Sequence, residues 1–198
     1  ESKKDLHCEI ARLAFGEIIT KKGNPERRNQ IKALIFGLAY GLSPDGFARN
    51  NGVTLEIAKE MYDKFFDTFT GVKEWYDKTK YTRSEFMRTI LGRKIWLHPY
   101  SYTRNTLALN CTIQGSAADM TKLAMKKFRK LCKDDIDNGN VGIILPVHDE
   151  VIIWSIESKA ELFRETLSRC MIDVAEQIHQ DIPAEVDSKI ADNWSEKG

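Results

Sequence analysis

The sequence of 198 residues has few cysteines, no long apolar run and almost no net charge. The four cysteines are far apart and include no Cys-x-x-Cys pair, which argues against a zinc knuckle or a disulfide framework and favours reduced thiols. No apolar run approaches the ~18 residues that a membrane helix requires, and the N-terminus lacks the apolar core of a secretion signal. A cytoplasmic or other intracellular location is therefore expected, with an organellar or viral origin left open.

The remaining composition is that of a globular protein. Hydrophobic residues account for 42% and charged residues for 30%, and 12 glycines and 5 prolines are too few for a collagen-like or low-complexity chain. The length suits one domain or two small subdomains that share a core. The first residue is Glu1 rather than Met, which suggests a chain cut from a longer polypeptide.

Positive charge is concentrated in one part of the sequence. Residues 1–105 contain 19 Lys and Arg against 13 Asp and Glu, a net charge of +6, whereas residues 106–198 contain 11 against 16, a net charge of −5. Between residues 78 and 104, Glu85 is the only acidic residue. Such a stripe favours a polyanionic partner, although a solvated surface with its counter-charges elsewhere in the fold is an alternative. The basic residues of the stripe are Lys78, Lys80, Arg83, Arg88, Arg93, Lys94 and Arg104.

The hydrophobic pattern predicts an α+β fold, in which helices are followed by a small antiparallel sheet. Helical spacing and capping residues predict helices over residues 8–19, 25–41, 54–76, 112–132 and 159–180. Residues 81–104 are expected to form a loop or short strands, and residues 134–140 an acidic loop. The apolar runs 141–147 and 151–156 predict a β-hairpin, and residues 184–190 a further possible strand.

The tip of the predicted hairpin is the first candidate site. His148, Asp149 and Glu150 separate the two apolar runs, so their side chains are expected at the end of a rigid sheet. Mg²⁺ prefers oxygen ligands and usually takes only one or two carboxylates, which makes Asp149 the first candidate ligand and Glu150 the second. Neighbouring residues on a strand point to opposite faces, so both reach one ion only if the turn twists them together. A solvated turn is the alternative.

The second candidate site lies on the helix that begins at Pro25. Arg28, Lys32, Phe36 and Tyr40 recur every four residues and therefore form one stripe along this helix. Two such cations suit a triphosphate, and an aromatic side chain next to them suits a base or a sugar. The alternative is a pair of surface cations followed by two core aromatics.

Taken together, the two candidate sites resemble the motifs of one enzyme family. The segment Arg28-x3-Lys32-x3-Phe36-Gly37-x2-Tyr40-Gly41 resembles motif B of family A DNA polymerases, and 147–150 (Val-His-Asp-Glu) resembles their motif C. Further similar segments lie around Asp5-Leu6-His7, at 89–94 and at 110–119, so that the resemblance extends from His7 to Trp194.

The resemblance implies a function and a set of site residues. The chain would take part in template-directed DNA synthesis, with primer-template DNA and a dNTP as ligands and Mg²⁺ in a two-ion site. The implied catalytic residues are Asp149, Glu150 and Lys32, with Asp149 as the metal ligand. The implied dNTP-binding residues are Arg28, Lys32, Phe36, Tyr40 and His7. The implied DNA-binding residues are Arg93, Lys94, Asn110, Gln114 and His148.

The resemblance also implies the domain organisation. Residues 1–104 would be the helical fingers, and residues 105–198 the C-terminal part of the palm. Family members carry a second metal-binding aspartate in motif A, which is expected before Glu1 and has no counterpart in this sequence. Two-ion phosphoryl transfer needs carboxylates that hold both ions, so the isolated chain is expected to be inactive and to belong to a larger or split polymerase. Missing palm strands would leave apolar sheet surfaces exposed.

Two other functions remain open at this point. One alternative is a non-catalytic nucleic-acid-binding fragment or a degenerate polymerase relative, which would bind primer-template DNA with a steep salt dependence but show no turnover. A purely structural helical module is the third possibility.

Overall fold

The computed structural model describes residues 5–193 and 196. Trp194, the last residue of the family resemblance, lies outside the described residues. The chain divides into two compact units, residues 1–113 and 114–198, and the boundary falls within one long helix. The secondary structure confirms the predicted α+β class, with two small antiparallel sheets among many helices. The assignment of residues 1–104 and 105–198 to fingers and palm stays a prediction.

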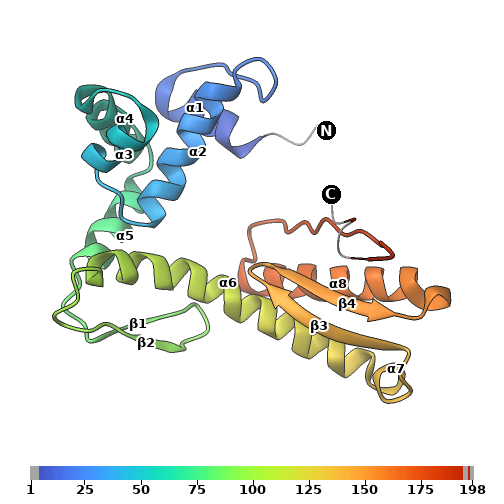
Figure 1. The fold of residues 1–198 in the computed structure, drawn as a ribbon. Helices are drawn as coiled ribbons and strands as arrows, with labels where there is room; N and C mark the ends of the chain where they lie inside the picture. The colour runs from blue at the N-terminus through green and yellow to red at the C-terminus, as the bar shows by residue number, and fades with distance from the viewer. Residues whose placement is uncertain (1–4, 194–195, 197–198) are drawn as a thin grey trace. The chain divides into compact units, whose positions relative to one another are not determined.

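The first unit is mainly helical (Figure 1). It contains one two-stranded antiparallel sheet, which follows the first five helices along the chain. Its helices are α1 (Leu6–Phe15), α2 (Pro25–Ala39), α3 (Pro44–Asn51), α4 (Leu55–Thr68), α5 (Thr70–Lys80) and the first part of α6 (Arg104–Leu131). Its strands are β1 (Phe86–Arg88) and β2 (Lys94–Trp96).

Local capping residues explain where several of these helices begin. The side chains of Asp5, Ser43 and Thr54 accept backbone N–H groups in the first turns of α1, α3 and α4. Helix α2 begins at Pro25 as predicted, but the side chain of Asn24 accepts the N–H of Thr20 instead of capping the helix. Proline at the first helical position supplies the required φ without a lost hydrogen bond.

Gly41 explains where α2 ends. The residue adopts a left-handed conformation with φ +69°. Its N–H donates to the carbonyl of Leu38 (2.9 Å), and the N–H of Leu42 donates to the carbonyl of Gly37 (2.8 Å). This pattern is a Schellman motif, in which a glycine closes the helix and satisfies its last carbonyls.

The helix predicted over residues 54–76 is wrong in one respect, because it is two helices. Phe69 ends α4 and precedes α5 with φ −111° and ψ 66°, outside helical geometry. The neighbouring Thr70 and Gly71 have low helix propensity, so a break there costs little. The apolar side chains that recur at helical spacing in this segment are also only partly buried, since Ile57 and Val72 are exposed.

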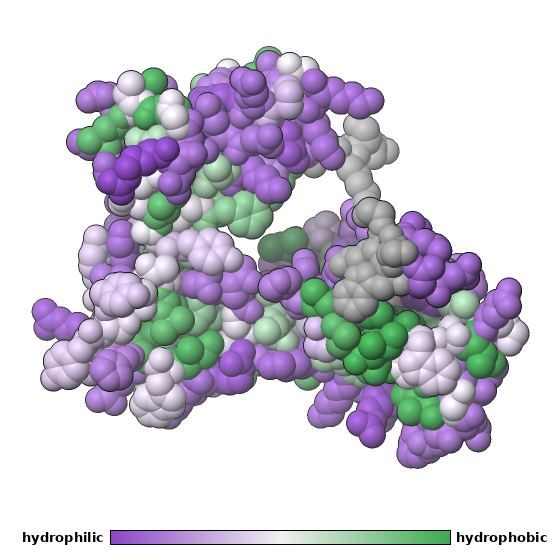
Figure 2. Space-filling model, viewed as in Figure 1, coloured by the Kyte–Doolittle hydropathy of each residue, from purple (hydrophilic) through white to green (hydrophobic). Residues whose placement is uncertain are grey.

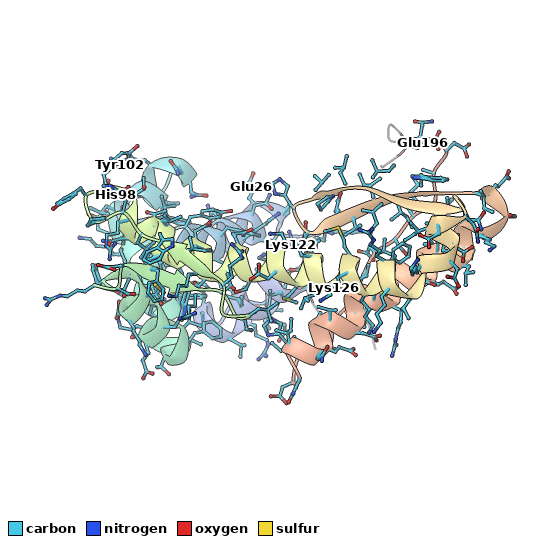
Figure 3. All side chains as sticks on the ribbon, turned by 90° about the horizontal axis from the view of Figure 1, so that it is seen from below. Glu26, His98, Tyr102, Lys122, Lys126 and Glu196 are labelled. Atoms are coloured by element: carbon cyan, nitrogen blue, oxygen red, sulfur yellow. The ribbon has the colours of Figure 1, made fainter. Side chains whose placement is uncertain are left out.

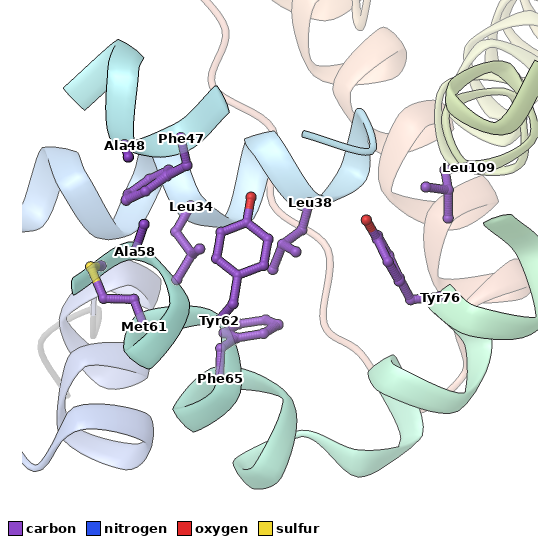
Figure 4. Close-up of a cluster of buried hydrophobic side chains, with 10 residues drawn as sticks. All are labelled: Leu34, Leu38, Phe47, Ala48, Ala58, Met61, Tyr62, Phe65, Tyr76 and Leu109. Carbon is purple, nitrogen blue, oxygen red and sulfur yellow. The ribbon is translucent and has the colours of Figure 1, made fainter. Parts of the chain in front are cut away.

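One hydrophobic cluster forms the core of the first unit (Figure 4). Tyr62 lies within it and donates its hydroxyl to the carbonyl of Leu42 (2.7 Å), which satisfies the one polar group of its side chain. Phe47 and Tyr62 meet edge to face with ring centroids 6.0 Å apart. The buried members are Leu34, Leu38, Phe47, Ala48, Ala58, Met61, Tyr62, Phe65, Tyr76 and Leu109. This core buries the face of α2 that carries Leu34 and Leu38, and the opposite, outer face of the helix stays exposed.

The second unit contains a β-hairpin and the helices that cover one of its faces. After α6 come α7 (Lys133–Asp137), β3 (Val141–Val147), β4 (Glu150–Ser155), a 3₁₀ turn (Glu157–Lys159) and α8 (Ala160–Ile178). Strands β3 and β4 pair antiparallel, which confirms the predicted hairpin. The predicted helix over 159–180 is confirmed as α8.

Three features of this part of the chain differ from the predictions. Helix α6 begins at Arg104 rather than Thr112. The predicted acidic loop contains α7, in which Lys133 and Asp137 form an ion pair across one helical turn. Residues 184–190 are not a strand, because no described segment pairs with them and a strand needs a hydrogen-bonded neighbour.

The β3–β4 hairpin packs one face onto the second core and exposes the other. Val141, Phe128, Phe163 and Cys170 are buried in this core. Ile144 is an extra residue in β3, because Ile143 pairs with Ile153 and Leu145 with Ile152. Ile144 and Trp154 are exposed, and Figure 2 shows hydrophobic side chains gathered over the hairpin. The expected exposure of apolar side chains on this hairpin is therefore observed, whereas its assignment to a palm stays a prediction.

Candidate active-site residues

An ion pair links the beginnings of α1 and α2. The guanidinium of Arg28 donates to Asp5 through Nη2 (2.6 Å to Oδ2) and Nε (3.0 Å to Oδ2, 3.1 Å to Oδ1). Asp5 also caps α1, since its Oδ1 accepts the N–H of Cys8 at 3.1 Å. The Arg28 guanidinium therefore holds the pKa of the Asp5 carboxyl well below its usual range. One edge of the guanidinium is fixed by this contact.

His7 joins the same cluster. Its Nδ1 lies 3.5 Å from Arg28 Nη2 and 3.6 Å from Asp5 Oδ1. Burial lowers the pKa of His7, and the positive charges of Arg28 and Lys32 also disfavour its protonation, against the opposing effect of Asp5. His7 is therefore mainly neutral at pH 7, and an anion bound beside it would favour its charged form.

Lys32 and the two aromatic residues continue along the outer face of α2. Lys32 Nζ lies 5.6 Å from the centroid of the Phe36 ring. Phe36 and Tyr40 are 49% and 48% exposed, while Leu34 and Leu38 of the same helix are buried in the core. Phe36 and Tyr40 are thus not the core aromatics of the alternative interpretation.

The arrangement on α1 and α2 has the chemistry of a phosphate site with an adjacent apolar platform. Arg28 and Lys32 lie one helical turn apart, and Asp5 balances only one of the two charges. The contacts with Asp5 use Nε and Nη2 of Arg28, so Nη1 takes no part in this ion pair. Guanidinium and ammonium donors of this kind bind phosphate oxygens, and the exposed ring of Phe36 can pack on a base or sugar.

At the hairpin tip, the chain reverses within two residues. Val147 pairs with Glu150, so His148 and Asp149 alone form the turn. His148 adopts a left-handed φ of 56°, which is unusual for a residue with a side chain and is often found at functional positions. Glu150, predicted to lie in the tip, is instead the first residue of β4, because it joins the hydrogen-bonded ladder.

The hairpin tip fits a metal ion only in part. Asp149 is exposed in the turn and can supply one carboxylate, and Glu150 follows directly in the chain. Within residues 5–193 and 196, no group of three or more His, Cys, Asp or Glu side chains lies close enough together to hold an ion. A Mg²⁺ ion held by one or two carboxylates completes its shell with water and substrate oxygens. The tip can therefore offer a ligand but, within the described residues, not a whole site.

The predicted DNA-binding residues occupy three different settings. Arg93 and Lys94 are exposed at the β1–β2 hairpin, and Lys94 Nζ lies 4.5 Å from the centroid of the Phe86 ring. Gln114 is exposed on α6. Asn110 lies one turn earlier on α6, and its Nδ2 is buried with no hydrogen-bond partner among the described residues. That donor must turn outward before it can contact a base.

Two members of the basic stripe have local structural roles. Arg104 donates to the carbonyls of Leu97 (2.9 Å) and Ser84 (2.6 Å), and Arg88 Nη1 donates to the carbonyl of Gly92 (2.9 Å). The sequence of the stripe favours a polyanionic partner. Arg104 instead fixes the loop that follows β2, because its guanidinium is bound to backbone carbonyls on both sides of the hairpin.

Asp5 is the site residue that sequence reasoning missed. The segment Asp5-Leu6-His7 resembles the polymerase family, yet only His7 receives a role from that resemblance. An Asp directly before a helical stripe is a recognisable capping signal. Its partner Arg28 is 23 residues away and belongs to another helix, so the ion pair appears only in the structure.

Comparisons with known proteins agree on one family. The model of DNA polymerase family A matches residues 1–196. DNA polymerase I of Aquifex aeolicus is 35% identical over 97% of this chain and 34% of its own length. DNA polymerase I of Caldicellulosiruptor bescii is 34% identical over 97% of this chain and 23% of its own length.

A solved structure shows the same likeness. It is the POL domain of Pol1 from M. smegmatis in complex with DNA primer-template and dNTP. The likeness has a TM-score of 0.74 with 32% sequence identity, and it covers 86% of this chain and 31% of that chain. The present chain thus spans only about a quarter to a third of the relatives it matches.

Proposed function

Because this chain belongs to DNA polymerase family A, we propose that it supplies the dNTP-binding residues and part of the metal site for template-directed DNA synthesis. In that reaction a primer 3′ hydroxyl attacks the α-phosphate of a dNTP, and pyrophosphate leaves. The observation that carries the proposal is the cluster of His7, Arg28 and Lys32 beside the exposed ring of Phe36.

In this proposal α1 and α2 bind the incoming nucleotide. Arg28 and Lys32 hold the triphosphate, and His7 adds a further contact that strengthens when the phosphates favour its protonation. Lys32 also counts as catalytic, because its charge offsets negative charge that develops on the departing phosphates. Phe36 packs against the sugar and base, and Tyr40 lies near the templating base.

The β3–β4 hairpin supplies the metal-facing residues. Asp149 holds Mg²⁺, Glu150 assists nearby, and His148 contacts the primer end. Mg²⁺ held there would supply positive charge that favours deprotonation of the primer hydroxyl and offsets the charge of the leaving pyrophosphate. Asp149 offers one of the carboxylates that a two-ion site needs, so we expect the second to come from the remainder of a polymerase and expect no synthesis by these 198 residues alone.

The remaining predicted residues contact primer-template DNA. Arg93 and Lys94 would bind the backbone, because both are exposed and carry charge. Gln114 and Asn110 would read the minor-groove side of the terminal base pair. The M. smegmatis relative, which is in complex with DNA primer-template and dNTP, supports these partners. We also propose an intracellular location, where DNA synthesis takes place. No described helix is long and apolar enough to cross a bilayer.

Nucleotide titration tests the proposal directly. Calorimetry of the chain with dTTP and Mg²⁺ should show binding that Arg28→Ala and Lys32→Ala each weaken about tenfold, since each removes a charge-assisted phosphate contact. Arg49→Ala is the matched control, because Arg49 is an exposed arginine on α3 that pairs with Asp45. Equal binding by all four proteins would contradict the proposed nucleotide site.

The same preparations separate the proposal from its main alternative. A non-catalytic DNA-binding fragment would bind primer-template with a steep salt dependence and show no loss of dTTP binding in Arg28→Ala. Primer extension by the unassisted chain would contradict the expectation that its metal site is incomplete.

A further inference from the structure

The segment after β2 carries an unusual group of exposed aromatic side chains. Trp96 is 64% exposed, Tyr100 is 91% exposed and Tyr102 is fully exposed. His98 lies among them and meets the ring of Tyr100 edge to face, with centroids 6.0 Å apart. Figure 3 shows His98 and Tyr102 projecting away from the ribbon. We call Trp96, His98, Tyr100 and Tyr102 the aromatic surface.

The aromatic surface stands on an ordered support. Arg104 donates to the carbonyls of Leu97 and Ser84, which ties both ends of the segment to the hairpin. The N–H of Tyr100 donates to His98 Nδ1 (3.3 Å), and that of Ser101 donates to the His98 carbonyl (3.2 Å). Trp96 rests edge to face on Phe86 with ring centroids 5.4 Å apart. The exposed rings are thus held by a turn rather than by burial.

Positive charge surrounds these rings. Lys94 Nζ lies 5.8 Å from the centroid of the Trp96 ring. Arg83 and Arg104 line the same hollow as Trp96 and His98, together with one acidic residue, Glu85. Glu85 is the only acidic residue between positions 78 and 104. Figure 2 shows hydrophobic and near-neutral side chains together over the β1–β2 hairpin.

We propose that the aromatic surface binds unpaired DNA bases by stacking, while Lys94 and Arg83 attract the adjacent phosphates. Exposed rings next to cations are the features that bind single strands, because every base offers a flat face and every nucleotide a negative charge. Paired bases in a duplex already stack on each other and present only their edges. The occupant is therefore a single strand, and the inference rests on the proposed function in which this chain meets a DNA template.

Two oligonucleotides of equal charge test the role of stacking. Fluorescence anisotropy would compare a labelled oligo-dT of about 12 nucleotides with an abasic strand of the same length. The wild type should bind oligo-dT about tenfold more tightly than the abasic strand. The triple variant Trp96→Ala/Tyr100→Ala/Tyr102→Ala should lose that preference and keep the affinity for the abasic strand. Equal wild-type affinity for the two strands would overturn the proposal.

Further variants serve as controls for the effects of charge and of folding on strand binding. Arg83→Ala/Lys94→Ala should weaken binding to both strands equally and reduce the salt dependence. Trp154→Ala, an exposed tryptophan on β4, should change neither affinity. Tyr102→Ala alone removes a fully exposed ring, so the fold is retained, and it should reduce the preference for oligo-dT severalfold. An unchanged preference in this variant and in the triple variant would overturn the role of the rings.

The proposal can fail separately from the nucleotide site. Arg28→Ala should leave oligo-dT binding intact, so loss of dTTP binding with intact oligo-dT binding concerns the proposed function alone. Conversely, normal dTTP binding with no preference for bases contradicts only the aromatic surface. Binding of phosphatidylserine vesicles that depends on the same three rings, without oligo-dT binding, would assign the surface to a membrane and overturn the proposal.

Discussion

At the scale of single residues, Asp5 shows how one side chain can serve a fold and a site together. It caps α1 and fixes one edge of the Arg28 guanidinium. Spacing alone identified Arg28, Lys32, Phe36 and Tyr40, because four-residue steps define a helix face whatever the rest of the fold does. Contacts between α1 and α2 depend on packing, and for that reason Asp5 and the position of His7 beside it were not predictable.

The Asp5→Asn variant separates the two roles by pH. Asn still caps a helix but carries no charge for Arg28. The carboxyl has a lowered pKa in the folded chain, so it adds stability above the unfolded value of about 3.9, and this contribution is lost as the pH falls through the folded pKa. The difference in free energy of unfolding between wild type and Asp5→Asn should therefore be largest near pH 7 and shrink below pH ~4.

Urea unfolding at pH 7 and pH 3 measures this difference. Asp45→Asn, which breaks the exposed pair with Arg49, is the control and should change stability little at either pH because both side chains are more than half exposed. A difference for Asp5→Asn that stays constant or grows toward pH 3 would contradict the ion pair as the source.

His148 is a second residue of interest, because its backbone conformation is unusual. Its left-handed conformation costs a residue with a Cβ roughly 1 kcal/mol relative to glycine. His148→Gly should therefore be about 1 kcal/mol more stable than His148→Ala, which keeps the strain. Chemical unfolding of the two variants measures this difference in the free energy of unfolding. Equal stability would mean that the turn relaxes and that His148 is not strained.

At the scale of helices and strands, the sequence predicted the features that depend only on neighbouring residues, such as helix starts and hairpins. Pro25 marked the start of α2, and the alternation of apolar and polar runs marked the β3–β4 hairpin. Where the outcome depended on other elements, prediction failed. The segment 184–190 has strand-forming residues but no described partner strand, and Phe69 interrupts a helical stripe that looks continuous in sequence.

Gly41 tests the account of how α2 ends. Both Gly41 and Gly52 close helices with positive φ, but only at Gly41 would a Cβ meet another side chain, Leu109 Cδ1 at 3.2 Å. Gly52→Ala should cost about 1 kcal/mol from backbone strain alone. Gly41→Ala should cost more, about 2 kcal/mol, because crowding adds to the strain. Equal losses in urea unfolding would argue against the close approach of Leu109.

At the scale of the whole molecule, two hydrophobic clusters support two compact units. The predicted boundary at residue 104 coincides with the start of α6, whereas the two units divide nine residues later, between residues 113 and 114. Sequence could not show this, because a helix that continues through a boundary carries no break in its pattern.

Core truncation in each unit tests this division. Leu34→Ala should destabilise the first unit by about 3 kcal/mol, and Phe163→Ala should destabilise the second by about 4 kcal/mol, because each side chain is fully buried in its own cluster. Hydrogen exchange read by mass spectrometry should show lost protection in the truncated unit alone. Equal loss in both units from either variant would mean that the chain unfolds as one.

The central claim is that His7, Arg28 and Lys32 hold a triphosphate, and the titration of His7 tests it most directly. The chain has 4 histidines, so NMR can follow each ring, with His179, which lies in neither proposed site, as the internal control. Without ligand, the pKa of His7 should lie below 6.5 because of burial and Arg28. Saturating dTTP should raise the His7 pKa above its ligand-free value, since phosphate charges favour the protonated ring, whereas thymidine should not. A His7 pKa that stays the same with saturating dTTP would contradict the claim.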